Sequence, residues 1–379
     1  MRIWIGPLIG SAFGCATAPS FSLPEQRLLV STDHGVRVLG SNFELDFAAT
    51  GVHMPEHLLV NHVDVLGVDD SCRGENRIGI AVSPAVQASA GVASDSNPEP
   101  LVLAAGPLIA KVQVHYALDY TCPKKERLSG ISEFTIFASG RIARWDSQVQ
   151  PSNNSLVRFG ECGCQHETDS ANFRDLFFAS FWAFDPVGAN QVQADGNPVT
   201  DDVLAACTLY TDHAIAVAWQ NPPPAESHTR FHSQRTASHS LDWPTSDHHM
   251  ILPTQQSVTS EIQITAAAPQ SKNTCAASLA NLAKAPLTIG SLSLNTDNDG
   301  VYRDPTVHTA AFDIVAGTAA VPPGFAISVD LGGADHAVIK DQNDTEHIAI
   351  AQREEGSRFF IIFNDVLMPG DSLTIEPRS

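Results

Sequence analysis

The sequence is short of positive charge. Its 379 residues include 22 Lys and Arg against 42 Asp and Glu, so the formal net charge is −20. A surface of this sign repels the phosphates of nucleic acids and the headgroups of anionic membranes, and no cluster of Lys and Arg interrupts it. We therefore expect no nucleic-acid partner. The acidity either serves only to keep the protein soluble, or leaves room for a neutral polymer, a cation, or an anion held by a few local basic side chains.

Familiar catalytic motifs are also missing. The sequence contains no Gly-x-Ser-x-Gly, His-Glu-x-x-His, phosphate-binding loop or dinucleotide fingerprint, which argues against several hydrolase and nucleotide-dependent classes. No stretch after the first 18 residues is long and apolar enough to cross a bilayer, so no transmembrane span is expected. With 43% hydrophobic residues, the chain is nevertheless too apolar to be disordered.

The first 24 residues are expected to be a signal peptide and tether. Arg2 is followed by a short apolar region and then by small residues, and that region is too short to span about 30 Å of hydrocarbon. The tripeptide ending at Cys15 resembles the cleavage box of bacterial lipoproteins, in which this cysteine is lipidated. Lipidation at Cys15 and simple secretion both remain open. Either predicts a location outside the cytoplasm, extracellular or at the cell envelope.

Six further cysteines follow. An even number in an exported chain favours disulfides, and six cysteines allow 15 connectivities that the sequence does not distinguish. The alternative is a metal site at Cys162, Cys164 and His166, although zinc sites usually space their cysteines more widely and need a fourth ligand. The six cysteines are Cys72, Cys122, Cys162, Cys164, Cys207 and Cys275.

Apolar and polar residues alternate along much of the chain, which is typical of β-strands. Residues 134–138 and 141–145 predict a hairpin around a two-residue turn, Ser139-Gly140. Further strands are expected at residues 27–31, 58–65, 213–219, 260–265, 325–331 and 358–363. In the clearest segment one face carries Val112, Val114, Tyr116, Leu118 and Tyr120, and the other carries Lys111, Gln113, His115 and Asp119.

The expected fold is all-β, with two modules. A large antiparallel β-sandwich over residues 25–266 is followed by a smaller C-terminal β-sandwich over residues 287–379. Residues 267–286 are expected to be a linker with a short alanine-rich helix, which ends at Pro286. In the second module, the segments 359–363 and 373–375 are expected to pair as terminal strands around a turn at residues 368–371.

Oxygen-bearing side chains alternate in a short loop of the second module. Asn295, Asp297 and Asp299, followed by Gly300, reproduce the opening half of a calcium-binding loop. The bidentate Glu that would close such a loop is missing, and Asp304 could contribute in its place. A run of Asp, Asn and Gly is equally typical of an ordinary turn. The pattern predicts either that turn or a structural calcium site, with Asn295, Asp297, Asp299 and Asp304 as metal ligands.

Histidines are concentrated between residues 228 and 249. Such a stretch can supply a base or bind a metal, and long loops are often functional. The alternative is a polar surface loop whose histidines serve no joint purpose. On the functional interpretation His232 and His249 are candidate catalytic residues, and Arg230 and Trp243 are candidate substrate-binding residues. The five histidines are His228, His232, His239, His248 and His249.

The polar side of the two clearest strands is a third candidate site. Trp145 could stack on the apolar side of a sugar ring while Lys111 and Gln113 bond its hydroxyls. If the sugar were a uronate, Arg141 or Lys111 could neutralise its carboxylate, and His115 or a tyrosine could take the proton in a β-elimination. His115 and Arg141 are thus candidate catalytic residues, and Lys111, Gln113 and Trp145 candidate substrate-binding residues. The alternative is a solvated outer face of the sheet.

These alternating strands, the hairpin at residues 134–145 and the smaller C-terminal module together resemble the β-sandwich regions of secreted polysaccharide lyases and galactose-mutarotase-like proteins. The resemblance covers residues 100–150 and 290–379 and includes no signature motif, so it assigns no catalytic residue by position. It implies a carbohydrate-active protein that binds or cleaves an extracellular polysaccharide, by β-elimination if it is a lyase. The alternative is a non-catalytic surface lipoprotein that serves as a scaffold for another protein or a cell-envelope component.

Overall fold

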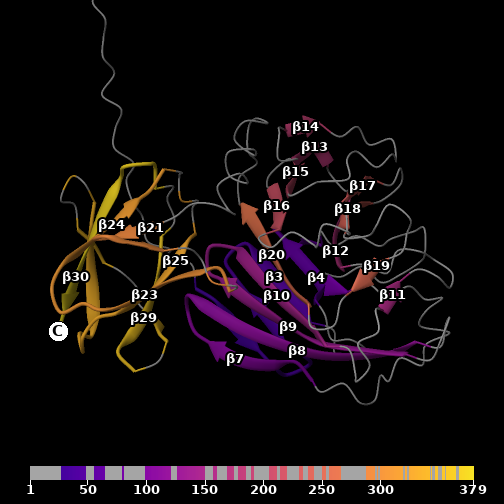
Figure 1. Cartoon of the computed structure of the whole chain (residues 1–379), viewed down its shortest axis with the longest axis horizontal. Helices are drawn as coiled ribbons and strands as arrows, with labels where there is room; N and C mark the ends of the chain where they lie inside the picture. The colour runs from indigo at the N-terminus through magenta and orange to yellow at the C-terminus, as the bar shows by residue number, and fades with distance from the viewer. Residues whose placement is uncertain are drawn as a thin grey trace, which may run out of the picture.

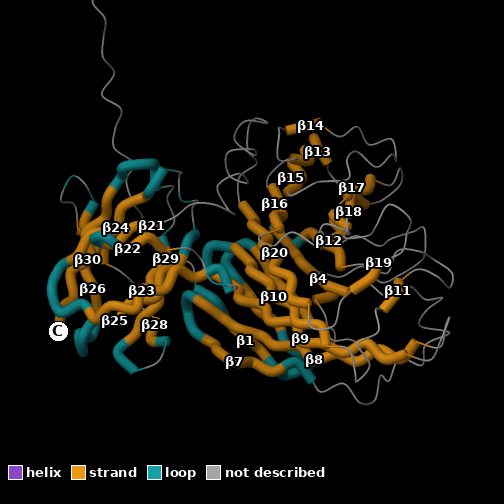
Figure 2. Tube along the Cα trace, viewed as in Figure 1, coloured by secondary structure: helices purple, strands orange, loops and turns teal. Residues whose placement is uncertain are grey.

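Every element that the structure describes is a β-strand. No helix occurs among the described residues (Figure 2), and the strands form several mostly antiparallel sheets, so the prediction of an all-β fold is confirmed. Side chains are described for residues 27–47, 99–115 and 131–145, for part of 55–62 and for most of 288–379. The computed structural model describes residues 27–47, 55–64, 79–80, 99–120, 126–149, 157–159, 169–174, 178–184, 189–191, 205–210, 214–219, 230–233, 238–242, 250–252, 256–265, 287–294, 297, 299–318, 321, 324–341, 343, 346–348, 352–354, 356–363 and 367–379.

The first module contains a five-stranded and a nine-stranded sheet (Figure 1). The five-stranded sheet is a meander of β1 (Leu29–Ser31), β2 (Arg37–Leu39), β3 (Phe43–Phe47), β4 (Pro55–Val60) and β5 (Val63–Asp64). The nine-stranded sheet runs in the order β14 (Ala189–Gln191), β13 (Phe178–Phe184), β15 (Ala205–Tyr210), β16 (Ala214–Trp219), β20 (Gln256–Thr265), β10 (Arg141–Val149), β9 (Glu126–Phe137), β8 (Ile109–Tyr120), β7 (Leu101–Ala105).

The apolar face of β8 packs toward the five-stranded sheet. Val112 and Val114 are fully buried, while the residues that alternate with them, Lys111, Gln113 and His115, are only half-buried. The alternation of the sequence therefore predicted the two faces correctly for these residues. Phe47 of β3 and Phe134 of β9 meet edge to face, with ring centroids 5.2 Å apart, which joins the two sheets into one core.

Two smaller sheets complete the first module. One has the order β17 (Arg230–Ser233), β18 (Ser238–Asp242), β12 (Asp169–Arg174), β6 (Gly79–Ile80), and the other pairs β11 (Val157–Phe159) with β19 (Met250–Leu252). β20 ends at Thr265 and β21 begins at Leu287. The linker and helix expected at residues 267–286 lie outside the described residues.

The C-terminal module is a smaller pair of sheets around its own core. The core includes the stacked rings of Phe325 and Phe363, whose centroids are 4.6 Å apart. β23 (Val301–Val307) and β25 (Ala326–Asp330) pair in parallel, whereas the other ladders between described strands are antiparallel. The six-stranded sheet has the order β22 (Leu292–Leu294), β21 (Leu287–Ile289), β24 (Phe312–Ala316), β30 (Ser372–Arg378), β26 (His336–Lys340), β27 (Glu346–Ile348). The four-stranded sheet has the order β23 (Val301–Val307), β25 (Ala326–Asp330), β29 (Arg358–Ile362), β28 (Gln352–Arg353).

Local details differ from the sequence-based expectations in three places. The single strand expected at residues 58–65 is the hairpin β4–β5, because Asn61 and His62 both adopt positive φ (49° and 67°) and form a tight turn. The turn between β9 and β10 spans three residues, 138–140, and ends at Gly140 with φ of 87°. The segments 359–363 and 373–375 do not pair with each other, because β29 and β30 belong to different sheets.

Candidate functional site

The antiparallel register gathers the polar residues of β8, β9 and β10 on one face of the nine-stranded sheet. Residues directly opposite each other in a ladder share a face, and Glu133 lies opposite both Gln113 and Trp145. His115 lies opposite Ile131. Leu101, which is 53% exposed on the edge strand β7, lies opposite Gln113. We call this set of partly exposed residues the open face; it consists of Leu101, Gln113, His115, Ile131, Glu133 and Trp145.

An imidazole and an amide are joined on the open face. Nε2 of His115 lies 2.8 Å from Oε1 of Gln113. Because an amide oxygen can only accept, Nε2 of His115 is the donor, and its Nδ1 is left as an acceptor in the neutral ring. The Gln113 amide keeps its NH2 group as a donor toward solvent or a ligand. The pair thus offers one acceptor and one donor at fixed positions.

Glu133 is a site residue that the sequence analysis missed. It occupies the centre of the open face, opposite Gln113 on one side and Trp145 on the other. The predicted strand began at residue 134, one position too late to include it, whereas β9 extends from Glu126 to Phe137. The signal that could have found it is the alternation of Glu133, Phe134, Thr135 and Ile136, which extends the predicted strand back to Glu133 and assigns that residue to the polar face.

The indole of Trp145 presents its hydrocarbon part rather than its N–H. The residue as a whole is half-buried, but its Nε1 atom is buried and makes no hydrogen bond to a described residue. The part of the ring that solvent reaches is therefore apolar. Such a surface can stack on another apolar ring face.

The C-terminal module covers a neighbouring part of the same sheet face. Arg141 and Ala143 precede Trp145 on β10 with the same period of two, but only 1% of each is exposed. Ala143, Ile109 and Phe137 form a shared core with residues of β23, β25 and β29, among them Val301, Ala326 and Phe360. The two modules therefore meet through a buried apolar interface.

Arg141 is buried in this interface, so its expected exposure on a wet face is wrong. Its guanidinium lies 5.4 Å from the centre of the Phe137 ring. Burial lowers the pKa of Arg141 to about 10, against the opposing effects of Tyr302 and Asp299, so the side chain remains charged at neutral pH. Arg144 is equally buried on the other face of β10, 5.9 Å from the Phe134 ring.

Gly300 allows the close approach of the C-terminal module to Arg141. Its φ is +73°, and an added Cβ would lie 3.0 Å from Cβ of Ala143 and 3.3 Å from Nη2 of Arg141. Gly356 has a similar φ of +59° but open space around it. We expect Gly356→Ala to cost about 1 kcal/mol of unfolding free energy from backbone strain, and Gly300→Ala about 1–3 kcal/mol more from crowding. Urea unfolding of both variants measures the difference, and equal losses would mean that the interface has room at this position.

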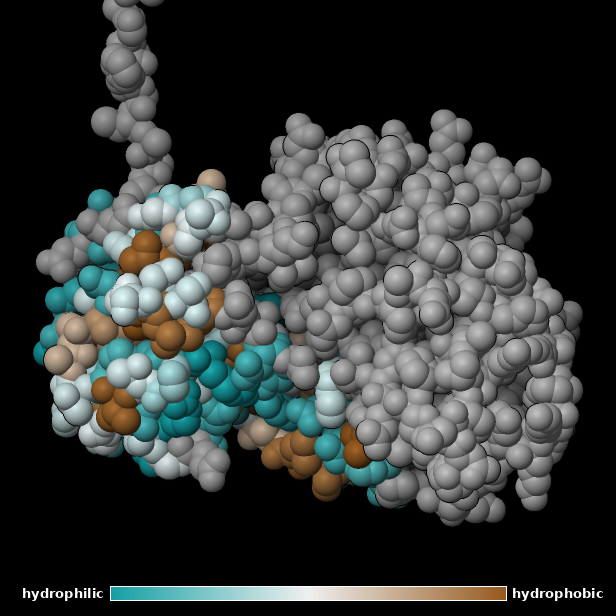
Figure 3. Space-filling view, viewed as in Figure 1, coloured by the Kyte–Doolittle hydropathy of each residue, from teal (hydrophilic) through white to brown (hydrophobic). Residues whose placement is uncertain are grey.

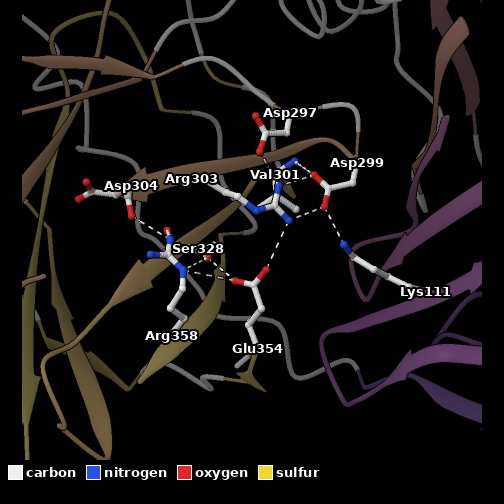
Figure 4. A network of polar contacts seen from close by, with 9 residues as sticks. All are labelled: Lys111, Asp297, Asp299, Val301, Arg303, Asp304, Ser328, Glu354 and Arg358. Atoms are coloured by element: carbon white, nitrogen blue, oxygen red, sulfur yellow. Dashed lines mark hydrogen bonds and ion pairs between the residues drawn. The ribbon is translucent and has the colours of Figure 1, made fainter. Parts of the chain in front are cut away.

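A polar network at the edge of the interface crosses between the modules (Figure 4). Nζ of Lys111 on β8 lies 2.7 Å from Oδ2 of Asp299, and the Arg303 guanidinium binds both oxygens of the same carboxylate at 2.7 and 2.5 Å. Arg303 also contacts Asp297 at 2.8 Å and Glu354 at 3.4 Å. Burial opposes the charge on Asp299, but the hydrogen bonds from Arg303 and Lys111 outweigh it and hold the pKa of this carboxyl below its usual value. On the face shown in Figure 3, hydrophilic residues gather beside the first module.

The predicted calcium ligands take part in this network as partners of cations and backbone groups. Asp299 is surrounded by Lys111 and Arg303, whereas Asp304 is fully buried and bonds the backbone N–H of Thr306 and the ring of His308. No group of three or more His, Cys, Asp or Glu side chains placed to hold a metal occurs within the described part of the chain. Asn295 lies outside that part. Calcium at this loop stays a prediction, and the donors that Asp299 binds already supply positive charge.

A buried amide fastens the modules at a second point. Oε1 of Gln352 on β28 accepts hydrogen bonds from the backbone N–H groups of Leu108 and Ile109, at 2.9 and 2.8 Å, and its Nε2 donates to the carbonyl of Ile109 at 3.0 Å. Gly106 packs so closely against this amide that a Cβ would collide with it. The apolar core, the ion pairs and this amide together fix the C-terminal module against one end of the nine-stranded sheet.

The side chains of the other predicted site residues lie outside the described part of the chain. In the histidine-rich stretch, β17 and β18 pair so that His232 lies opposite Ser240 and His239 opposite Ser233, while Arg230 lies opposite Asp242; their side chains are not described. His228, Trp243, His248, His249 and the lipidation candidate Cys15 lie outside the described residues, and no cysteine side chain is described. Within the described residues no helix could span a membrane.

Comparisons with known proteins yield only distant structural likenesses. No family model matches the chain, and no curated protein matches it. One similar solved structure is a heparinase III, with 7% identity and a TM-score of 0.33; the match covers 79% of this chain and 40% of the heparinase. Another is the galactose 1-epimerase of Lactobacillus acidophilus, with 9% identity and a TM-score of 0.30; the match covers 64% of this chain and 99% of the epimerase. A third is the α-galactosidase AgaA of Geobacillus stearothermophilus, with 6% identity and a TM-score of 0.28; the match covers 42% of this chain and 24% of the galactosidase. The chain thus spans about a quarter of that galactosidase and 40% of the heparinase.

Proposed function

We propose that the open face of the first module binds a polysaccharide. The observation that carries the proposal is the register that places the half-buried Trp145 directly beside Glu133, with Gln113 and His115 on the next strand. A sugar ring has an apolar side for the indole and a rim of hydroxyls for polar groups. The Glu133 carboxylate can accept from two adjacent hydroxyls, and the Gln113 NH2 group can donate to a third.

Binding is proposed here without β-elimination. Elimination at a uronate needs a cation beside the sugar carboxylate as well as a base. Lys111 is ion-paired with Asp299, and Arg141 is buried under the C-terminal module. His115 could still act as a base, but the described part of the open face offers no cation to accompany it. Sugar binding requires none.

The setting proposed for this binding is outside the cytoplasm. The charge, apolar stretch and small residues of the first 18 positions support export, and Cys15 supports a lipid anchor. An exported sugar-binding protein would meet polysaccharides of the cell envelope or the surroundings. The excess of acidic residues would keep it soluble there.

Trp145→Ala is expected to weaken polysaccharide binding at least tenfold, because buried aromatic anchors commonly contribute about 2 kcal/mol or more at binding sites. The measurement is affinity electrophoresis against a panel of neutral and acidic polysaccharides. Trp145→Phe should retain part of the affinity, and Leu29→Ala, which removes an exposed leucine of β1, should leave it unchanged. Unchanged binding by a folded Trp145→Ala variant would dispose of this site. If the wild-type protein bound none of the panel, the scaffold alternative would take the place of sugar binding.

A further inference from the structure

We infer that the open face selects uncharged polysaccharides and that Glu133 is the residue that rejects acidic ones. The inference rests on the proposed function and narrows it to a class of ligand. It depends on which charges the fold leaves available on the face. The residues concerned are those between 101 and 115 and between 131 and 145, whose side chains the structure describes.

These two segments contain three basic residues, and each is engaged away from the open face. Lys111 shares the face, but its ammonium is 2.7 Å from Oδ2 of Asp299, and only 17% of its side chain is exposed. Arg141 lies under the C-terminal module, next to Phe137. Arg144 projects from the opposite side of β10, beside Phe134 and against the five-stranded sheet. Within residues 101–115 and 131–145, the described side chains of Lys and Arg are thus all turned away from a ligand on the open face.

The same segments contain one acidic residue, Glu133, at the centre of the open face. A half-buried carboxylate is an effective acceptor for vicinal hydroxyls. A ligand carboxylate placed in the same position would meet a like charge, and no described side chain of the open face offers a cation to offset it. Like charges brought together at an interface disfavour binding strongly. Glu133 can therefore both bind a neutral sugar and discriminate against a uronate.

The orientation of neighbouring groups supports this assignment. His115 donates to Gln113, which leaves acceptor and donor capacity suited to hydroxyls rather than to an anion. Leu101 and Ile131 add apolar surface at the edge of the face. The described groups thus match a ligand that has hydroxyls and an apolar ring side but no charge.

The test uses polyuronates before and after chemical reduction of their carboxyl groups, since reduction removes the charge and keeps the linkages. The wild-type protein is expected to bind the reduced forms at least about tenfold more tightly than the acidic forms. Added salt should narrow this difference by screening the repulsion. Glu133→Gln is expected to reduce the difference to about threefold or less, mainly by strengthening the binding of the acidic forms.

Asp297→Asn is the matched control, because it removes one negative charge at a position 58% exposed in the C-terminal module. It should leave the preference for reduced polymers unchanged. Wild-type protein that bound acidic and reduced forms equally, or a Glu133→Gln variant with the wild-type ratio, would overturn the inference while leaving sugar binding intact. Failure of the wild-type protein to bind any polymer would overturn the proposed function and this inference together.

Discussion

Gln352→Leu is expected to lower the free energy of unfolding by about 2–5 kcal/mol. The leucine would fill a similar volume, but the N–H groups of Leu108 and Ile109 would lose the acceptor that Oε1 of Gln352 provides. A buried backbone donor left without a partner costs about 1–3 kcal/mol. The carbonyl of Ile109 would suffer less, because it also accepts from the N–H of Gly106. Two orphaned donors at the interface therefore account for most of the expected loss.

Urea unfolding followed by tryptophan fluorescence and by circular dichroism measures this loss. The matched control is Asn343→Leu, which makes the same kind of amide-to-leucine change at an exposed position and should alter the free energy by less than about 0.5 kcal/mol. If the modules also lose their cooperation, the two probes will report separate transitions for Gln352→Leu and a single one for wild type. Equal stability of the two variants would show that the amide does not join the modules.

Period-two alternation was enough to predict the all-β fold and the two faces of β8 among its described residues, because it follows from the local geometry of a strand. Val112 and Val114 are buried and Gln113 and His115 are not, as their alternation indicates. Alternation does not say what covers a face. Arg141 and Trp145 have the same period on β10, yet one lies under the C-terminal module and the other is half-buried. The difference arises from contacts with residues far away in sequence, such as Gly300.

The loop at residues 295–304 illustrates the same limit for a functional site. Alternating Asp and Asn residues supply oxygen atoms, and the sequence pattern alone fits a metal site as well as an ordinary turn. Whether a carboxylate binds a metal or a side-chain cation depends on what else the fold brings close. Lys111 is 188 positions away from Asp299, and no local pattern connects the two. Likewise the turn at Asn61 and His62 was missed because it contains no glycine, and residues other than glycine rarely adopt positive φ.

Asp299→Ala is expected to lower the free energy of unfolding at neutral pH by about 3–5 kcal/mol, which is typical for removing one member of a largely buried ion pair. Side chains of Asp299 and Lys111 are only 12% and 17% exposed. Without the carboxylate, the ammonium of Lys111 would lie in the interface without its described partner, whereas Arg303 would keep its contacts to Asp297 and Glu354. The larger share of the cost should therefore come from Lys111. Adding Lys111→Met to Asp299→Ala should recover part of the loss, because it removes the stranded charge.

The dependence of this loss on pH distinguishes an ion pair from simple packing. The pKa of Asp299 is lower in the folded protein than its ordinary value, which is about 3.9 for an unfolded chain. A carboxyl with a lowered folded pKa contributes its full stabilisation above the unfolded pKa, and the contribution is lost as the pH falls through the folded pKa. The difference between wild type and Asp299→Ala should thus be constant from about pH 5 to 8 and shrink below about pH 4. Asp297→Ala removes the more exposed of the carboxylates that bind Arg303. Its free energy of unfolding should differ from that of wild type by only about 1 kcal/mol or less. A loss for Asp299→Ala that persisted unchanged to pH 2 would mean that its carboxylate charge does not hold the modules together.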